Sequence, residues 1–311
     1  MRFGLFTGLT GITWTRLQEL WSHIEATGWD AAFVTDHFMP NVPDPVEDTL
    51  ECWTALAGLA HTTTRMRLGT LVSGNTYRHP AVLAKMATTI DIMSNGRLIC
   101  GMGAAWQSNE HAAYGIPFYT VGERLSRLEE ACQVLLDLWQ QPKTTLAGKY
   151  YQLTDAPLFP KPIQQPHPEL LIGGGGEKRT LRIAAKYADH WNVWGGPAIL
   201  TRKGRILEEH CAAIGRDPAQ ITRSANMPLL ITEKAEEGER VVRGLMRRFG
   251  RSEADARDTV LTGSVTQIQD TLGRLQEAKV DMLCIPTFLP PWQTEQLDRL
   301  ITEVAPTFRT S

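Results

Sequence analysis

Residues 66–118, MRLGTLVSGNTYRHPAVLAKMATTIDIMSNGRLICGMGAAWQSNEHAAYGIPF, decide the fold of this chain. They predict a strand at Arg67–Val72, an irregular polar loop, a helix over residues 80–94, a second strand at Arg97–Gly101 and a glycine-bearing turn. This order is that of a βαβ crossover, whose two strands run parallel. In such sheets ligands bind at the carboxyl ends of the strands, and both ends here open into polar loops. The stretch therefore predicts an α/β enzyme.

The same alternation of short apolar runs and longer amphipathic stretches continues along the chain. The other strands are expected at Phe3–Thr7, Ala31–Thr35, Glu169–Ile172, His190–Trp194, Arg223–Ile231 and Asp281–Pro286. The other helices are expected near residues 14–27, 49–64, 120–140, 177–188, 199–214, 235–258, 265–279 and 293–304. Near-continuous apolar runs such as AAFV and LICG are typical of parallel strands buried on both faces. The alternation predicts a (β/α)8 barrel, an α/β fold.

Residues 141–168 interrupt this rhythm with a stretch rich in proline and polar residues, QPKTTLAGKYYQLTDAPLFPKPIQQPHP. It is too long for a simple loop in a compact domain. We expect a β-hairpin or an extended excursion inserted between strands four and five. Residues 1–311 are then expected to form a single barrel domain.

Composition excludes several classes of protein. The chain has 311 residues, is 42% hydrophobic and carries a net charge of −2, so neither nucleic acid nor an anionic membrane is an expected partner. No apolar run is long enough to span a bilayer, and the start lacks a signal-peptide pattern. We expect a soluble, cytoplasmic protein. The five cysteines are scattered and the histidines show no ligand spacing, so we assign neither disulfides nor a metal site.

The strongest local signal is a run of four glycines between a strand and a helix, LLIGGGGEKRTL at residues 170–181. Glycine lets the backbone approach an anion, and the first N–H groups of a helix carry positive partial charge. Lys178 and Arg179 add formal charge. A phosphate site is the favoured interpretation, and a flexible turn is the alternative. The pattern is neither a P-loop nor GxGxxG.

Three further strand ends carry candidate residues. Histidine at the end of a barrel strand is well placed for proton transfer, so His37 is a candidate acid or base. Asp36 could orient it, or the two could merely cap the loop. The turn after Arg97–Gly101 could admit a flat ligand or reflect close packing. The loop at residues 73–80 directs several donors over the barrel mouth, with Arg78 as a plausible anion contact.

Together these segments resemble the luciferase-like superfamily, in particular its F420-dependent oxidoreductase branch. The resemblance is carried by VTDHF at 34–38, GTLVSGNTYRHPAVLAKMATTID at 69–91, SNGRLICGMGAAW at 94–106, HAAYGIPF at 111–118, GGGGEKRTLRIAAKYADHWN at 173–192 and GSVTQIQDTLGRLQEAKVD at 263–281. It implies a barrel with an insertion after strand four, a homodimer and a deazaflavin, coenzyme F420, in the barrel mouth.

The resemblance also implies positions for the site residues. A bulge after strand three, with a non-prolyl cis peptide at Leu71–Val72, would support the ring of the cofactor. The glycine turn, Gly173–Gly176, would hold its phosphate. The cofactor-binding residues are then expected to be Leu71, Val72, Ser73, Asn75, Gly101, Gly103, Ala104, Gly173, Gly174, Gly175, Gly176, Glu177 and Lys178. The catalytic candidates are His37 and Asp36.

Two positions depart from the sugar-phosphate dehydrogenase of that branch. Its acidic glutamate aligns with Trp106, and a tryptophan after DHF corresponds to Asn41. These departures argue against glucose 6-phosphate and leave the proton donor and the substrate open. The predicted activity is hydride transfer between deazaflavin C5 and a small organic substrate. The rivals are an FMN-dependent monooxygenase, a non-catalytic flavin-binding barrel and, last, a phosphate-binding aldolase or isomerase.

Overall fold

The computed structural model describes residues 1–42, 46–287 and 293–309. Eight parallel strands form its centre: β1 (Arg2–Thr7), β2 (Ala31–Val34), β3 (Arg67–Thr70), β5 (Leu98–Gly103), β8 (Glu169–Gly173), β9 (His190–Trp194), β10 (Thr222–Asn226) and β13 (Met282–Pro286). Their order is β3-β2-β1-β13-β10-β9-β8-β5, and β5 pairs back to β3, which closes the sheet. The predicted (β/α)8 barrel is confirmed.

The strands form where the chain offers short apolar runs that can be buried on both faces. Every residue of β2, β5 and β13 is buried. Inside the barrel, Phe6, Phe33, Ile99, Leu171 and Met282 belong to one apolar cluster. A larger core lies between the sheet and the surrounding helices.

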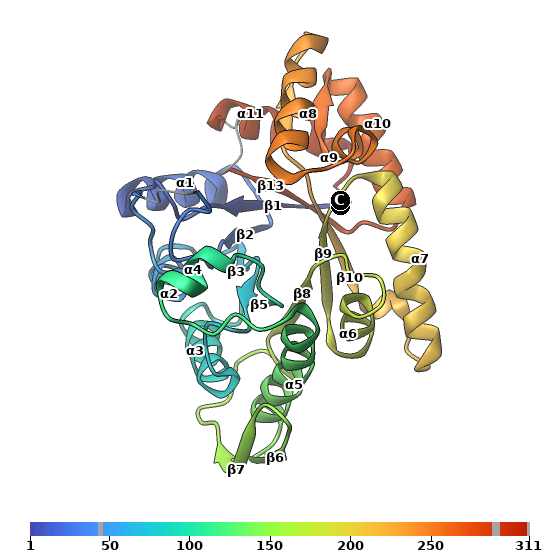
Figure 1. Ribbon diagram of the computed structural model, residues 1–311. Coiled ribbons are helices and arrows are strands. Elements are labelled where there is room, and N and C mark those ends of the chain that lie inside the picture. Colours follow the sequence, from blue (N-terminus) through green and yellow to red (C-terminus); the bar gives the residue numbers. More distant parts are fainter. Residues whose placement is uncertain (43–45, 288–292, 310–311) are drawn as a thin grey trace.

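Helices follow the strands around the barrel (Figure 1). They are α1 (Trp14–Ala26), α2 (Cys52–Thr62), α3 (Pro80–Met93), α4 (Ser108–Ala113), α5 (Val121–Gln140), α6 (Thr180–Tyr187), α7 (Pro197–Ala213), α10 (Val265–Glu277) and α11 (Thr294–Arg299), with 3₁₀ turns at Pro218–Gln220 and Ala305–Thr307 and a π turn at Leu300–Val304. Local signals set their starts. Pro80 opens α3, and Ser264 forms a capping box with Gln267 at the start of α10.

The insertion predicted at residues 141–168 is a β-hairpin followed by an extended segment. Strands β6 (Lys143–Ala147) and β7 (Gln152–Pro157) pair antiparallel, outside the barrel sheet. The hairpin lies beyond the end of α5, at the bottom of the view in Figure 1. It separates β5 from β8, the fourth and fifth barrel strands, as expected.

A second excursion, between β10 and α10, was not expected. The prediction of one strand at Arg223–Ile231 is wrong: β10 ends at Asn226, and β11 (Leu229–Ile231) pairs with β12 (Leu261–Gly263) in a separate sheet. Pro228 lies between them and has no N–H to continue the ladder.

The prediction of one helix over residues 235–258 is also wrong. The structure has α8 (Ala235–Phe249) and α9 (Glu253–Thr259). The break follows from two residues. Gly250 adopts a left-handed conformation with φ of 61° and ends α8, and the Ser252 side chain then accepts the N–H of Asp255 and caps α9.

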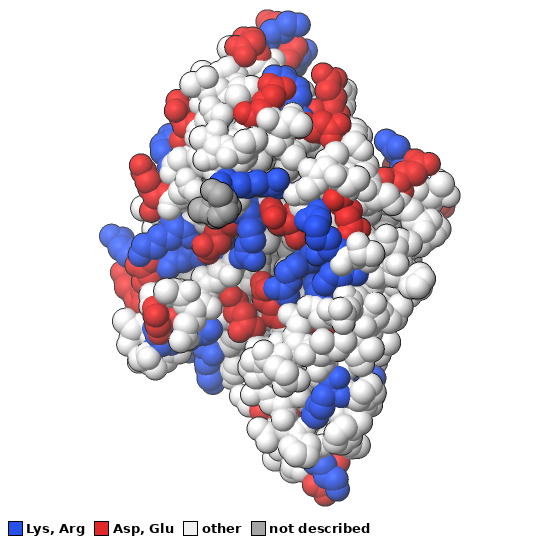
Figure 2. All heavy atoms as spheres, turned by 180° about the vertical axis from the view of Figure 1, so that it is seen from behind, with Lys and Arg blue, Asp and Glu red and all other residues white. Residues whose placement is uncertain are grey.

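The surface carries charges of both signs. On the face seen in Figure 2, Lys and Arg are interspersed with Asp and Glu, which agrees with the net charge of −2. Within the described ranges, none of the helices has the length and apolarity that a bilayer crossing requires. All five cysteines are buried and free.

Candidate functional site

The mouth of the barrel is shaped first by an irregularity in its third strand. The Leu71–Val72 peptide bond is cis, as the family resemblance implied. Gly69 lies opposite Ile99 and Ser73 lies opposite Met102, so four residue steps on one strand face three on β5. One extra residue is therefore accommodated between β3 and β4 (Ser73–Gly74), which is a bulge.

Close packing against this bulge explains three of the predicted cofactor glycines. A Cβ on Gly101 would lie 1.9 Å from the carbonyl oxygen of Thr70. A Cβ on Gly103 or Gly173 would lie 2.6 or 2.7 Å from a methyl group of Val72. The glycines let the bulge lie against β5 and β8, and the Val72 side chain fills the space that they leave. The packing alternative thus has a direct structural basis at these positions.

Asp36 is buried in an ion pair and is not bonded to His37. Both Asp36 oxygens accept hydrogen bonds from the Arg78 guanidinium, at 2.6 and 3.1 Å, and Oδ2 also accepts from the Ser73 hydroxyl. Arg78 donates to Glu51 as well, and the indole of Trp53 donates to Ser73 Oγ at 2.9 Å. Asp36, Ser73 and Arg78 therefore fix the β2 and β3 loops to each other.

The partner of His37 is a carboxylate that the sequence analysis did not single out. Nδ1 of His37 donates to Oε1 of Glu110 at 2.8 Å, and the Phe38 N–H donates to Oε2 at 2.8 Å. The Tyr77 hydroxyl donates to Oε1 as well. Glu110 is fully buried, whereas the side chain of His37 is 24% exposed. The imidazole of His37 is thus partly exposed at the barrel mouth, and the buried Glu110 carboxylate binds its Nδ1.

The charge of Glu110 is held by the hydrogen bonds that it accepts and by its attraction to His37. Burial acts to raise the pKa of this carboxyl, but the hydrogen bond and charge of His37, with the hydrogen bonds from Tyr77 and Phe38, outweigh it and lower the pKa below its usual value. The ionised carboxylate keeps the proton of His37 on Nδ1. Nε2 is then the basic atom, and among the described residues it has no hydrogen-bond partner.

The short helix α4 explains why Glu110 was missed. It has six residues, too few to show an apolar period, and it had not been expected. Trp106, just before it, is 59% exposed and meets His37 edge to face, with ring centroids 5.5 Å apart. The sequence signal that could have identified Glu110 was its position four residues after Trp106. In the structure Trp106 contacts one edge of the His37 ring, and Glu110 binds its Nδ1.

Asn75 lies beside the bulge with one unsatisfied atom. Its N–H donates to the Gly103 carbonyl at 3.0 Å, and its Nδ2 donates to the Arg124 carbonyl at 3.2 Å. Its Oδ1 has no hydrogen-bond partner, and water does not replace one because the residue is only 3% exposed. Burying an oxygen without a hydrogen bond lowers the stability of the fold unless a donor reaches it. An N–H group of a bound ligand would supply that donor. Ala104, the neighbouring candidate, accepts from Arg124 Nε through its carbonyl oxygen at 3.0 Å.

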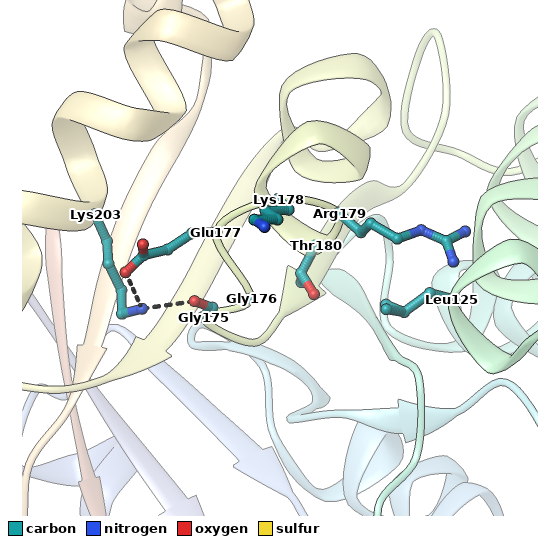
Figure 3. Close-up of a pocket in the computed structure, with 8 residues that line it drawn as sticks. All are labelled: Leu125, Gly175, Gly176, Glu177, Lys178, Arg179, Thr180 and Lys203. Carbon is teal, nitrogen blue, oxygen red and sulfur yellow. Dashed lines mark hydrogen bonds and ion pairs between the residues drawn. The ribbon is translucent and has the colours of Figure 1, made fainter. Parts of the chain in front are cut away.

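The glycine turn borders an open hollow of ≈ 430 Å³ (Figure 3). The hollow is lined by Leu125, Gly175, Gly176, Glu177, Lys178, Arg179, Thr180 and Lys203. No acceptor within the described chain takes the N–H groups of residues 175–178. Four consecutive unpaired donors beside three cationic side chains form a site suited to an anion.

Glycine is required in this turn for different reasons at different positions. Gly174 has a φ of +126°, which other residues rarely adopt. A Cβ on Gly175 would lie 2.9 Å from Val193 Cγ2, and one on Gly176 would lie 2.7 Å from Thr180 Oγ1. A phosphate close to this backbone would meet those added carbons.

The helix after the turn begins later than expected. Residues 177–188 were predicted to be helical, but α6 starts at Thr180, because residues 177–179 form a turn. Glu177 binds cations: its Oε1 accepts from Arg202 and, at 3.1 Å, from Lys203. Lys203 Nζ also donates to the Gly175 carbonyl at 2.6 Å (Figure 3). The ammonium group of α7 thus lies at the turn.

Comparisons with known proteins agree with this geometry. Residues 1–283 match the model of the luciferase-like monooxygenase family. An uncharacterized protein of Mycobacterium tuberculosis is 30% identical over 191 residues, which is 61% of this chain and 64% of that protein. An F420-dependent glucose-6-phosphate dehydrogenase of Amycolatopsis mediterranei is 33% identical over 191 residues, 59% of this chain and 52% of that enzyme.

The chain thus matches between about half and two thirds of the length of these relatives. Among solved structures, an F420-dependent secondary alcohol dehydrogenase superposes with a TM-score of 0.86 over 99% of both chains at 20% identity, a likeness of fold. Because the family model covers most of the sequence, including every barrel strand up to the start of β13, the chain belongs to the luciferase-like monooxygenase family.

Proposed function

We propose that the protein is an F420-dependent oxidoreductase that transfers a hydride between deazaflavin C5 and a small organic substrate. The observation that carries this proposal is the hollow beside the glycine turn, where four free N–H groups and Lys203 suit a cofactor phosphate. It opens at the same face of the barrel as His37. Curated relatives at 32–33% identity are named F420-dependent glucose-6-phosphate dehydrogenases, which supports the choice of cofactor.

The residues present fit a bound deazaflavin. The Gly174–Lys178 turn would hold its phosphate, the Leu71–Val72 bulge would support its ring, and the unsatisfied Oδ1 of Asn75 would accept a ring N–H. When bound, the cofactor supplies the hydride acceptor or donor. The chain supplies position, and a basic atom at Nε2 of His37.

His37 would move the substrate proton. In oxidation of an alcohol, Nε2 takes the hydroxyl proton while the carbinol hydrogen leaves as hydride, and in reduction the same nitrogen returns the proton. Glu110 stabilises the positive ring that forms, because it already binds Nδ1–H. Glucose 6-phosphate is not the proposed substrate, since Trp106 and Asn41 stand where the sugar-phosphate enzyme has its glutamate and tryptophan.

The test is titration of the purified protein with F420 and with FMN separately, following the quenching of protein fluorescence. F420 should bind more tightly. Lys203→Met should weaken F420 binding, because it removes the ammonium group that binds the Gly175 carbonyl at the turn, whereas Lys143→Met on the exposed hairpin should not. Tighter binding of FMN, with oxygen consumption on reduction, would replace the proposal by a flavin monooxygenase. Binding of neither would leave the phosphate interpretation without support.

The homodimer implied by the family resemblance stays a prediction. Size-exclusion chromatography with light scattering would check it, with 34.7 kDa expected for one chain.

A further inference from the structure

The part of the mouth around His37 is apolar at its rim. The segment that follows β5 exposes large aromatic side chains: Trp106 at 59%, Tyr114 at 58% and Phe118 at 37%. Exposed aromatic groups that gather beside a functional side chain mark a binding surface more often than chance exposure. Trp106 meets His37 edge to face, so its indole lies beside the ring that carries Nε2.

The opposite part of the mouth is also aromatic. Trp194, at the end of β9, lies 6.2 Å from Phe6 and 6.2 Å from Phe249, measured between ring centroids. Phe249 comes from the end of α8 and is 44% exposed. The barrel mouth therefore offers aromatic contact surface on both sides.

The charges around His37 oppose a substrate anion. Glu110 is ionised and bonded only to neutral donors and His37. Arg78 is shared between two carboxylates, Asp36 and Glu51, so it leaves one negative charge uncompensated. A phosphate or carboxylate placed against Glu110 would therefore lie beside an anionic carboxylate.

The guanidinium groups closest to His37 are already occupied. Arg78 is 13% exposed and bound as described, and Arg124 donates to the carbonyl oxygens of Ala104 and Tyr119 and lies over the Phe118 ring. On the opposite side, Arg248 lies over the Phe249 ring, 5.8 Å from its centroid, and Arg251 donates to Thr259 Oγ1 at 2.6 Å. The stretches 43–45 and 288–292 contain no lysine or arginine in their sequence. The cations of the glycine turn lie at the site proposed for the cofactor phosphate.

From this distribution we infer that the enzyme acts on an uncharged substrate whose reacting carbon–oxygen group carries an apolar body. The inference rests on the function proposed above and narrows its substrate class. Trp106 is the specificity-determining residue: it supplies flat apolar surface beside His37 and no group that could pair with an anion.

The test uses two ketones that differ only in charge, acetophenone and 4-acetylbenzoate. Each is titrated calorimetrically into protein loaded with F420, after F420 binding has been measured by itself. Acetophenone should bind at least about tenfold more tightly than 4-acetylbenzoate, because the aromatic side chains around His37 offer the carboxylate no cation to replace its hydration. Equal affinity, tighter binding of the anion, or no binding of acetophenone would overturn the inference. F420 binding alone would then still support the proposed function.

Variants of Trp106 locate the effect. Trp106→Ala should weaken acetophenone binding about five- to tenfold through the loss of aromatic contact. Trp106→Lys should reduce or reverse the preference over 4-acetylbenzoate. Both should fold, since the side chain is largely exposed, and thermal unfolding checks this. Ile214→Ala is the matched control, because Ile214 is 52% exposed at the far end of α7. An unchanged preference in Trp106→Lys would remove Trp106 from the substrate site.

Discussion

At the scale of single residues, the proposed proton transfer depends on the hydrogen-bonded pair of His37 and Glu110. A buried carboxylate bonded to neutral donors can stabilise positive charge on the imidazole, and it fixes which ring nitrogen is free. Asp36 has no such part, because both of its oxygens bind Arg78. The positioning residue for His37 therefore lies 73 positions away in sequence and comes from another barrel loop.

We expect His37→Ala to lower kcat by about 10²–10⁴-fold with little change in F420 affinity, since a proton-transfer group is lost. Glu110→Gln should lower kcat by a comparable factor, because the amide favours the wrong tautomer of the ring. The double variant should be no slower than His37→Ala, since both residues act through the same nitrogen. Steady-state kinetics with F420 binding measured in parallel checks this.

Glu209→Gln is the matched control for Glu110→Gln, since Glu209 has a side chain 67% exposed on α7. It should leave kcat unchanged. Additive losses in the double variant would show that Glu110 acts elsewhere, and a near-normal kcat in His37→Ala would return proton transfer to another residue of the rim.

At the scale of elements, the strand–turn–helix unit β8–α6 carries the site proposed for the cofactor phosphate. The sequence gives no reason to distinguish Gly174 from Gly175, but in the structure their backbone conformations differ. Gly174 has positive φ, so a side chain there strains the backbone itself. Gly175→Val is the cleaner test: its Cβ meets Val193 and the flexible end of Lys203, so it should weaken F420 binding more than it lowers stability.

F420 titration and urea unfolding of the same preparation check that prediction. Gly244→Val in α8 is the control, because a Cβ at Gly244 meets nothing within 4 Å. It should leave F420 affinity at the wild-type value. Wild-type affinity in Gly175→Val would mean that the turn is structural only.

The elements also show how far sequence reasoning reaches. The barrel strands were predictable because burial on both faces requires continuous apolar runs. The glycine turn was predictable because its four glycines are consecutive in the sequence. Helix α4 and Glu110 were not, since a six-residue helix has no readable period and the contact with His37 forms only when two loops meet. The β11–β12 excursion was missed because Pro228 and Gly250 interrupt patterns that otherwise read as continuous.

At the scale of the whole molecule, a largely buried ionic network lies at the end of the barrel opposite the mouth. Glu169 opens β8, and its carboxylate binds Arg67 at the start of β3 and His190 at the start of β9. His190 continues to Ser224 on β10 at 2.7 Å. Strands that are far apart in sequence are thus joined inside the barrel, where burying a charge is tolerated only if it is paired.

This network predicts how stability depends on pH. Burial acts to raise the pKa of Glu169, but the hydrogen bond and charge of His190, with the charge of Arg67, outweigh it and lower the pKa to about 2. Since the folded pKa lies below the unfolded value, the stabilisation is complete above about pH 4.5 and is lost as pH falls toward 2. Its full size is roughly 3 kcal/mol, because each tenfold change in proton affinity between the folded and unfolded states is worth about 1.4 kcal/mol.

Glu169→Gln should therefore unfold at lower urea concentration than wild type at pH 7, and the difference should shrink as pH falls from 4.5 toward 3. Glu19→Gln removes a carboxylate from an exposed pair with Arg16 and should change stability by less than about 1 kcal/mol at any pH. If the stability difference between Glu169→Gln and wild type stayed constant with pH, the lost stability would come from packing and not from charge. The charge network would then contribute nothing to the stability of the barrel.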